Sequence, residues 1–472
     1  MKNSKRVLVV AGEYPPLKTI GRIRTAKFVE HMRKFGWQPY VLTVSYKESD
    51  GNYFKELVDE IPDDVKVFRV ENDTYDEQFI RIIKRLLSGI TSQNNHVTTS
   101  DNISQINSTS KIKNTKDNHI KDILLRLYKS FFKQWVNIPD DYIIWSNRAH
   151  YEALTIIKEH DIDLIYTSLP PISAAITGYK LKLATSLPWI VDYRDLWTGD
   201  VLREWINPLR NRYEVYLEKK LIKKADVVIA VSEQKTDYLK KLHTSASCHW
   251  ATLTNGYDKD VFEPLLKEQN KVKGHSDTLN FVYTGRLFKN RRGYAFAEAL
   301  GQLSEEHPEL IRKVSVQIYG GVSEEIMKRY DEILKHYKIE HLYHFHGDVS
   351  YMEAMKAQVN ADYLLLIVDT GLTSDGVIPG KLFEYIASQR PIFALCNEGA
   401  TKDIIERANA GIVVPVESVK ECKKSLYNLL QINVPVTPSF DVQYLEQFDR
   451  NNISKKLTQL FDRTIASYQA ND

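Results

Sequence analysis

The chain has few cysteines, no long apolar run and almost no net charge. Its 472 residues include three cysteines, Cys248, Cys396 and Cys422, which are widely spaced and set in apolar surroundings. This scattered, odd set is neither a disulfide framework nor a zinc pattern, and it favours a reducing compartment. No stretch approaches the roughly 18 apolar residues of a membrane span. The apolar run near the N-terminus is too short for a signal-peptide core, so we expect a cytoplasmic protein.

The charge balance and the missing motifs argue against a nucleic-acid-binding protein, a dehydrogenase and a metalloprotein. The formal net charge of +3 lacks the concentrated basic face of a nucleic-acid-binding protein, so we expect no nucleic-acid partner. The first predicted βα loop lacks the three-glycine fingerprint of dinucleotide binding, which argues against a dehydrogenase. His344 and His346 alternate along a predicted strand without further ligands at metal-binding spacing. We therefore expect no metal site and no cofactor.

Short apolar runs alternate with helical segments along the chain, which indicates α/β architecture with doubly wound parallel sheets. A second series of runs begins at Phe281–Thr284, after the turn-rich segment Asn255–Pro264. A chain of this length favours two domains over the alternative of one large sheet. We predict domains over residues 1–262 and 270–440, and a helical tail over 441–472 that packs back across the junction. The predicted strands are Val7–Ala11, Pro39–Val44, Val65–Arg69, Leu164–Thr167, Trp189–Asp192, Val227–Val231, Phe281–Thr284, Val314–Tyr319, His341–His346, Tyr363–Val368, Ile392–Leu395 and Ile412–Val414.

One segment of the first domain departs from this pattern. Residues 88–119 are rich in Ser, Asn, Thr and Lys, which predicts a disordered insertion. Residues 120–135, IKDILLRLYKSFFKQW, place most apolar side chains on one helical face beside basic neighbours. A basic amphipathic helix with Trp and Phe suits a membrane interface that carries anionic lipid. An ordinary helix packed on the domain fits the same pattern, and the sequence does not choose between them.

The segment Asp375–Ala387, DGVIPGKLFEYIA, predicts a nucleotide site. It lies between two apolar runs, Tyr363–Val368 and Pro391–Leu395, and so completes a βαβ unit. The N-terminus of its helix exposes unpaired backbone N–H groups, which suit an anion. Glu384, one turn into that helix, is placed to accept hydrogen bonds from the vicinal hydroxyls of a ribose. Phosphate together with a diol indicates a nucleotide.

A basic cluster follows the first strand of the second domain. Residues 284–293 contain Arg286, Lys289, Arg291 and Arg292. Open α/β sheets bind ligands at the carboxyl ends of their strands. A diphosphate leaving group needs fixed positive charge there if no metal neutralises it. The alternative is a solvated charge run.

Polar residues at strand ends of the first domain predict an acceptor site. Asp192, Arg194 and Asp195 follow the strand Trp189–Asp192, where a carboxylate is placed to orient or deprotonate a hydroxyl. The alternative is an internal Asp–Arg ion pair that holds the loop. Ser173, after the preceding strand, either shapes the acceptor pocket or forms a turn.

The first βα loop contains Gly21, followed by Arg22. A glycine at this place lets a ligand approach the backbone closely. We include both residues in the predicted acceptor side.

Taken in order, these segments resemble the retaining, family 4-like group of GT-B glycosyltransferases that builds bacterial surface polysaccharides. The resemblance covers nearly the whole chain and includes PWIVDYRDLWTGD, VYTGRLFKNRRG and PGKLFEYIASQRPIFAL. It implies two Rossmann-like domains that face a cleft and bind a nucleoside-diphosphate-sugar as co-substrate. The implied acceptor is a glycan or a polyprenyl-diphosphate-linked glycan, reached by peripheral contact with the inner face of the plasma membrane. The implied reaction is metal-independent transfer with retention, in which the bound phosphate takes the acceptor's proton.

The resemblance also assigns roles to individual residues. Glu384 matches the second glutamate of the E-x7-E motif, which binds ribose in relatives, whereas the position of the first glutamate is occupied by Gly376 with Asp375 beside it. Pro379 has no N–H, so the phosphates are left to the amides around Ile378, Gly380 and Lys381. Arg286 matches the first basic residue of the GR motif, Arg291 or Arg292 the second, and Gly21 the first-loop glycine. Asp195 lies in a motif typical of the family, and we predict Asp195 and Arg286 as catalytic residues.

Two other functions fit part of this pattern. A GT-B-fold nucleotide-sugar epimerase would share the architecture, but no matching set of acid and base residues is evident. A non-catalytic partner that binds nucleotide sugar would explain Gly376 at the position of the first glutamate. It would leave the basic cluster and Glu384 without a purpose.

Overall fold

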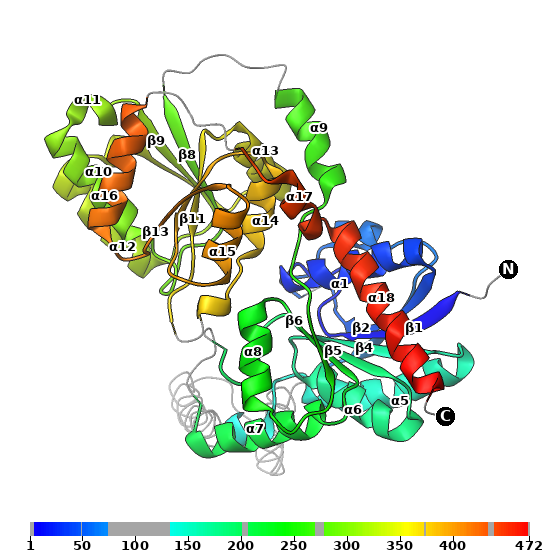
Figure 1. Cartoon of the computed structure of the whole chain (residues 1–472). Helices are drawn as coiled ribbons and strands as arrows, with labels where there is room; N and C mark the ends of the chain where they lie inside the picture. Colours follow the sequence, from blue (N-terminus) through cyan, green and yellow to red (C-terminus); the bar gives the residue numbers. More distant parts are fainter. Residues whose placement is uncertain are drawn as a thin grey trace, which may run out of the picture.

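Two parallel sheets organise the chain (Figure 1). The computed structural model describes residues 4–48, 50–73, 133–200, 206–269, 278–371, 374–432 and 439–470. The first sheet has the strand order β3-β2-β1-β4-β5-β6-β7 and the second has the order β10-β9-β8-β11-β12-β13. Both orders reverse next to the first strand of the domain, and such a reversal is where open α/β sheets bind ligands. The strands are β1 Lys5–Ala11, β2 Trp37–Ser45, β3 Lys66–Glu71, β4 Leu164–Leu169, β5 Trp189–Tyr193, β6 Val227–Ala230, β7 His249–Thr252, β8 Leu279–Thr284, β9 Val314–Tyr319, β10 Tyr343–Gly347, β11 Tyr363–Ile367, β12 Ile392–Leu395 and β13 Gly411–Val414.

Helices cover both faces of each sheet because the strands are apolar on both sides. In β1, Leu8 and Val10 pack toward α5 (Ile143–Glu159) and α6 (Ser173–Thr185), whereas Val7 and Val9 pack toward α1 (Gly21–Met32) and α18 (Arg450–Gln469). The prediction of two doubly wound α/β domains is therefore confirmed. The main helices are α1 Gly21–Met32, α5 Ile143–Glu159, α6 Ser173–Thr185, α7 Pro208–Ile222, α8 Glu233–Leu242, α9 Lys259–Gln269, α10 Tyr294–Glu306, α12 Glu324–Tyr337, α13 Tyr351–Asn360, α14 Gly380–Ala387, α15 Ala400–Arg407, α16 Val419–Gln431, α17 Val442–Leu445 and α18 Arg450–Gln469.

Two local features differ from the sequence predictions. The edge strand β7 was not expected, because its four residues are only partly buried and show no apolar run. The segment predicted as turns around Pro264 instead contains most of α9. Phe262 and Leu265 of that helix pack with Met355 and Val359 of α13. This packing holds the helix together despite the proline, which removes one backbone hydrogen bond.

The C-terminal tail leaves the second domain and packs on the first. Leu457 and Phe461 of α18 join the core on the α1 side of the first sheet. The ring centroids of Phe461 and Trp37 are 5.1 Å apart.

The predicted insertion 88–119 and most of the predicted helix 120–135 lie outside the described residues. In the ranges given above, no helix has the length and apolar character needed to cross a membrane.

Asp258, which follows β7, ties the tail to α1. Its carboxylate lies 2.7 Å from Nη1 of Arg450, 3.3 Å from Nε2 of His31 and 3.4 Å from Nζ of Lys27. Burial by itself would raise the pKa of Asp258, but the hydrogen bond with His31 and the charges of Arg450 and Lys27 outweigh it. The pKa of Asp258 is therefore held below its ordinary value of 3.8.

We expect Asp258→Asn to lower the free energy of unfolding by about 3 kcal/mol at neutral pH, because it leaves the partly buried Lys27 and Arg450 without their counter-charge. The folded-state pKa is depressed, so the contribution of this carboxylate is fully present above the pKa of an unfolded aspartate. It is lost as the pH falls below about 4. Denaturant unfolding between pH 7 and pH 2 measures the difference between variant and unchanged protein. A difference that stays constant over this range would contradict the assignment.

Candidate active site

The start of α14 forms one wall of the site in the second domain. Pro379 precedes the helix with an extended ψ of 133°, and its side chain offers no cap to the first amides. An added Cβ at Gly380 would meet no atom within 4 Å, so the backbone here borders open space. The first amides of a helix have no intrahelical acceptor. Gly380 and Lys381 therefore present N–H groups to the space in front of α14, while Ile378 lies half-buried just before it.

Glu384 lies one turn into α14 and is held by side chains of α13. Its Oε2 accepts a hydrogen bond from Nε2 of Gln358 at 3.1 Å, and its Oε1 accepts one from the Tyr351 hydroxyl at 3.3 Å. Nε2 of Gln358 also donates to Oγ1 of Thr284 at 3.0 Å. The carboxylate is thus fixed beside the end of β8, with lone pairs left for a ligand.

Lys381 and Arg291 concentrate positive charge beside this helix start. Nζ of Lys381 donates to the Tyr283 hydroxyl at 3.0 Å. Burial lowers the pKa of Lys381 well below its ordinary value of 10.5, and the nearby Arg291 guanidinium lowers it further. Gly285, at a φ of +124°, leaves the space that the Lys381 ammonium fills. An anion bound between these two cations would relieve their repulsion, which favours a phosphate here.

Asp369, which follows β11, is the counter-ion of Arg291. Its Oδ2 lies 2.5 Å from Nη2 of Arg291, and the Asp369 side chain is 2% exposed. Its Oδ1 is buried and has no hydrogen-bond partner among the described residues. Asp369 lines a small pocket together with Ser374 and Asp375. The basic cluster is therefore adjacent to the turn that precedes α14.

The other two arginines of the cluster lie in different places. Arg286 is 76% exposed, with Nη2 at 3.6 Å from Asp348, so its guanidinium is free to reorient toward a ligand. Arg292 turns away and pairs with Glu417 at 2.6 Å. Sequence matching left Arg291 and Arg292 as alternatives. The geometry places Arg291 beside Lys381 and Arg292 on the α16 side.

Four residues predicted on the acceptor side are held by partners within the protein: Asp192, Ser173, Arg22 and Arg194. Asp192 is fully buried, and its carboxylate accepts from Arg24 at 2.8 and 3.0 Å and from the Tyr166 hydroxyl. The alternative of an internal Asp–Arg pair is correct, but the partner is Arg24. Ser173 is buried at the start of α6, where its hydroxyl donates to Asp140 at 2.5 Å. Arg22 is 11% exposed, and its guanidinium pairs with the carboxylate of Glu60.

Gly21 and Arg194 meet at the first residue of α1. Arg194 donates to the carbonyl groups of Leu169 and Pro170 and pairs with Glu13 at 2.8 Å. This ion pair joins the loops after β1, β4 and β5. A Cβ at Gly21 would overlap both the Glu13 carboxylate and the Arg194 guanidinium. The glycine is needed for this close packing, whether or not a ligand also approaches its backbone.

We expect Gly21→Ala to lower the free energy of unfolding by about 2 kcal/mol, because the added methyl group must displace the partly buried ion pair of Glu13 and Arg194. Gly51→Ala is the matched control, since a Cβ at Gly51 would meet no atom within 4 Å. The control should change stability by no more than about 0.5 kcal/mol. Urea unfolding curves measure both. Equal effects of the two substitutions would contradict the proposed packing role.

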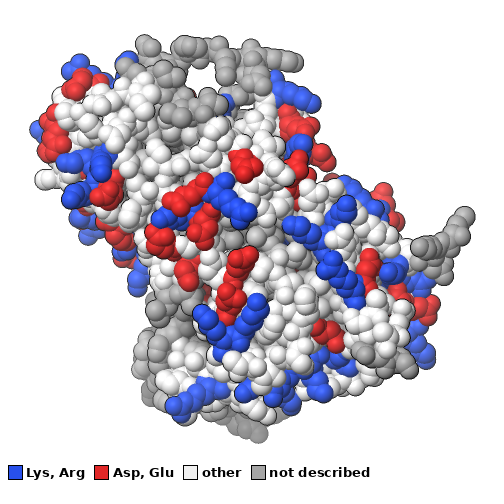
Figure 2. Space-filling view, viewed as in Figure 1, with Lys and Arg blue, Asp and Glu red and all other residues white. Residues whose placement is uncertain are grey.

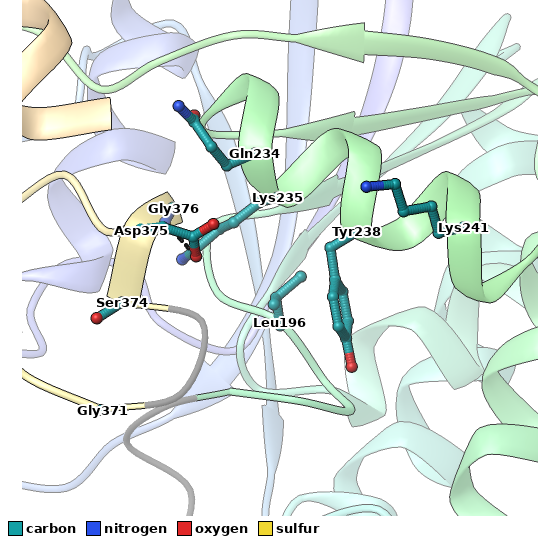
Figure 3. A pocket seen from close by; sticks show the side chains of 9 residues that line it. All are labelled: Leu196, Gln234, Lys235, Tyr238, Lys241, Gly371, Ser374, Asp375 and Gly376. Atoms are coloured by element: carbon teal, nitrogen blue, oxygen red, sulfur yellow. Dashed lines mark hydrogen bonds between the residues drawn. The ribbon is translucent and has the colours of Figure 1, made fainter. Parts of the chain in front are cut away.

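Between the domains lies a pocket of about 470 Å³ (Figure 3). Gln234, Lys235, Tyr238 and Lys241 of α8 line one side, and Ser374, Asp375 and Gly376 of the turn before α14 line the other. Leu196 lies in its wall, next to Asp195, whose side chain is 53% exposed. Nζ of Lys235 lies 3.3 Å from Oδ1 of Asp195. An exposed carboxylate with one cationic neighbour is thus available at the edge of the pocket.

Gly376 lets the two domains approach each other at this pocket. Its carbonyl accepts a hydrogen bond from the Ser232 hydroxyl, the N-cap of α8, at 2.8 Å. A Cβ at position 376 would lie 3.0 Å from Cγ of Lys235. A larger side chain would therefore have to displace Lys235. Asp375, beside it, is exposed to the pocket, and its Oδ1 accepts from the Gly376 amide at 3.0 Å.

Comparison with known proteins supports the interpretation of this two-domain site. The family model described as Glycosyltransferase Family 4 matches residues 127–261, and the model described as Glycosyl transferases group 1 matches residues 278–431. The chain is a family 4-like GT-B glycosyltransferase. No curated protein matches it by sequence.

Solved structures similar to this glycosyltransferase show the same fold. Sucrose-phosphate synthase from Thermosynechococcus elongatus has a TM-score of 0.63 at 14% identity, over 98% of this chain and 100% of that one. A glycosyltransferase from Rickettsia africae has a TM-score of 0.60 at 13% identity, over 98% and 99% of the two chains. Anabaena HepE in complex with UDP has a TM-score of 0.58 at 12% identity, over 97% and 100%.

Several residues of the glycosyltransferase's site were missed by sequence reasoning. Lys235 lies on a helix of ordinary composition, and only the fold brings it to Asp195. Gln358, which orients Glu384, looks like any polar residue of an amphipathic helix. Asp369 carried a usable signal, because it lies two residues after the apolar strand β11, at the sheet's carboxyl edge.

Proposed function

We propose that this glycosyltransferase transfers a sugar, with retention, from a nucleoside-diphosphate-sugar to a hydroxyl of a glycan or lipid-linked acceptor in cell-surface polysaccharide biosynthesis. The observation that carries the proposal is the grouping of Arg291 and Lys381 with Glu384 around the start of α14. Two cations and free helix amides suit a diphosphate, and a carboxylate one turn later suits a ribose. The UDP bound in HepE supports a nucleoside diphosphate as the ligand class.

In the proposed reaction, the bond between the anomeric carbon and the diphosphate oxygen breaks, and negative charge develops on the leaving group. Arg291 and Lys381 meet this charge with fixed donors, and the exposed Arg286 turns toward it, so the reaction needs no metal ion. The acceptor oxygen bonds to the anomeric carbon from the face that the diphosphate leaves. The acceptor's proton passes to the departing phosphate. No side chain is then required as general base.

We place the acceptor in the pocket between α8 and the turn before α14. Asp195, paired with Lys235 at its edge, is positioned to orient a sugar hydroxyl. A polyprenyl-linked acceptor would hold the enzyme at the inner face of the plasma membrane. The basic amphipathic sequence of residues 120–135 fits this peripheral location.

The proposal is tested by incubating the protein with radiolabelled nucleotide sugars and a bacterial membrane-lipid extract. We expect label to move into the organic phase with release of nucleoside diphosphate. The anomeric coupling constant of the product, measured by NMR, should match that of the donor. Conversion of the donor to its epimer without an acceptor would favour an epimerase. Inversion at the anomeric carbon would contradict the mechanism.

A further inference from the structure

The outward face of α7 carries a row of exposed apolar and aromatic side chains. Leu209, Tyr213 and Tyr216 are 63%, 47% and 59% exposed. Their spacing of four and three residues places them on one side of the helix. The two tyrosine rings are stacked, with centroids 6.5 Å apart. A single exposed apolar side chain is ordinary, but a row of three on one helical face marks an interaction surface.

The charged residues of α7 are sorted by sign between its two faces. Glu214 and Glu218 are fully buried. Glu214 accepts from Nε1 of Trp197 at 2.8 Å, and Glu218 accepts from the Thr198 hydroxyl. The exposed charged residues of α7 and its C-terminal end are all basic: Arg212, Lys219, Lys220, Lys223 and Lys224. The acidic side chains of α7 therefore face the protein interior and its basic side chains face outward. Figure 2 shows Lys and Arg gathered along the lower edge of the molecule, where Figure 1 places α7.

We propose that this outward face of α7 docks on a membrane surface rich in anionic phospholipid. Tyrosine and leucine side chains insert at the boundary between headgroups and acyl chains, and lysines beside them attract anionic headgroups. Charge complementarity favours this occupant, because the exposed charges of the face have one sign over its whole length. The buried Arg210 of α7 donates to the carbonyl groups of Asn137 and Pro139, which holds the segment that follows the exposed Trp135 against this helix.

The docking face is joined to the acceptor side of the site. Trp197 and Thr198 donate hydrogen bonds to the buried glutamates of α7. In the sequence they directly follow Asp195 and Leu196. A membrane bound by α7 would therefore lie close to the pocket that receives a lipid-linked acceptor. The role of this membrane contact in reaching a lipid-linked acceptor rests on the proposed function. The test of the contact itself does not depend on that function.

The test is sedimentation of the full chain with vesicles of phosphatidylglycerol and phosphatidylcholine, compared with phosphatidylcholine alone. We expect binding to the anionic vesicles only, weakened by added salt. Lys219→Glu with Lys220→Glu should lower the partition coefficient at least tenfold, and Tyr213→Ser with Tyr216→Ser about fivefold. Lys328→Glu with Lys335→Glu on α12 makes the same charge change on another exposed helix. This control should stay within about twofold.

Calorimetric titration with UDP separates the two proposals. Loss of vesicle binding in both α7 variants, with unchanged UDP affinity, supports the docking face. Vesicle binding that depends on α7 in a protein that binds no nucleotide would leave the docking face in place and remove the proposed function. Equal vesicle binding by all variants, or no sedimentation with either vesicle, overturns the docking proposal.

Discussion

Lys381→Met is expected to lower the transfer rate by a factor of about 10² to 10³ without lowering the stability of the ligand-free protein. The rate falls because the substitution removes a fixed cation that meets the charge developing on the diphosphate. The stability holds because burial and Arg291 already lower the pKa of Lys381 in the folded state. A lysine whose folded-state pKa is depressed costs stability at any pH at which it is charged in the unfolded chain. Methionine removes that cost and keeps the length of the side chain.

Initial-rate assays and calorimetric melting of the ligand-free protein measure the two effects. Lys356→Met is the matched control, since Lys356 is an exposed lysine on the neighbouring helix α13. Its rate should be unchanged. A Lys381 variant that keeps its rate within threefold, or that loses rate only in proportion to lost folded protein, would contradict the role assigned to this ammonium.

Glu384→Ala is expected to weaken UDP binding about 30-fold, as a lost hydrogen bond between a ribose and a charged group costs roughly 2 kcal/mol. The ribose is bound equally before and during the reaction. KM for the donor should therefore rise while kcat stays within about threefold. The fold should persist, because Gln358 keeps its hydrogen bond to Thr284 when the carboxylate is removed.

Calorimetric titration with UDP gives the affinity, and donor-dependent initial rates give the separate kinetic constants. Glu406→Ala, an exposed glutamate on α15, is the control and should leave the UDP affinity unchanged. If kcat fell by the full 30-fold at constant KM, Glu384 would act on the reacting centre and not on the ribose.

Local sequence patterns predicted the parts of the site that depend on one element. The apolar run of β11, the turn at Gly376 and Pro379, and the helix that follows are all contiguous in sequence. Lys381 and Glu384 therefore had to lie at the start of one helix and one turn into it. Alternating apolar runs were likewise sufficient to predict two doubly wound domains, because strands buried on both faces are apolar throughout.

Side-chain direction at strand ends was not predictable in the same way. Asp192 lies near the end of β5, but its partner Arg24 lies 168 residues earlier in the chain. The sequence offered Arg194 as the nearer arginine, and that side chain instead reaches Glu13. The sequence could not distinguish between Arg291 and Arg292 for a related reason. Neighbouring side chains leave the backbone in different directions, and only the positions of Asp369 and Glu417 show which one faces Lys381.

The central claim is that a nucleoside-diphosphate-sugar binds at the start of α14, and thermal stabilisation tests it most directly. The purified protein would be melted with UDP-, GDP- and ADP-sugars, beside Glu384→Ala and Arg286→Ala. A ligand at about 100 times its Kd adds roughly 2.7 kcal/mol to stability. We predict a rise in Tm with one nucleotide class that is reduced in both variants. No rise with any nucleotide sugar, or an equal rise in all three proteins, would contradict a donor site at this helix.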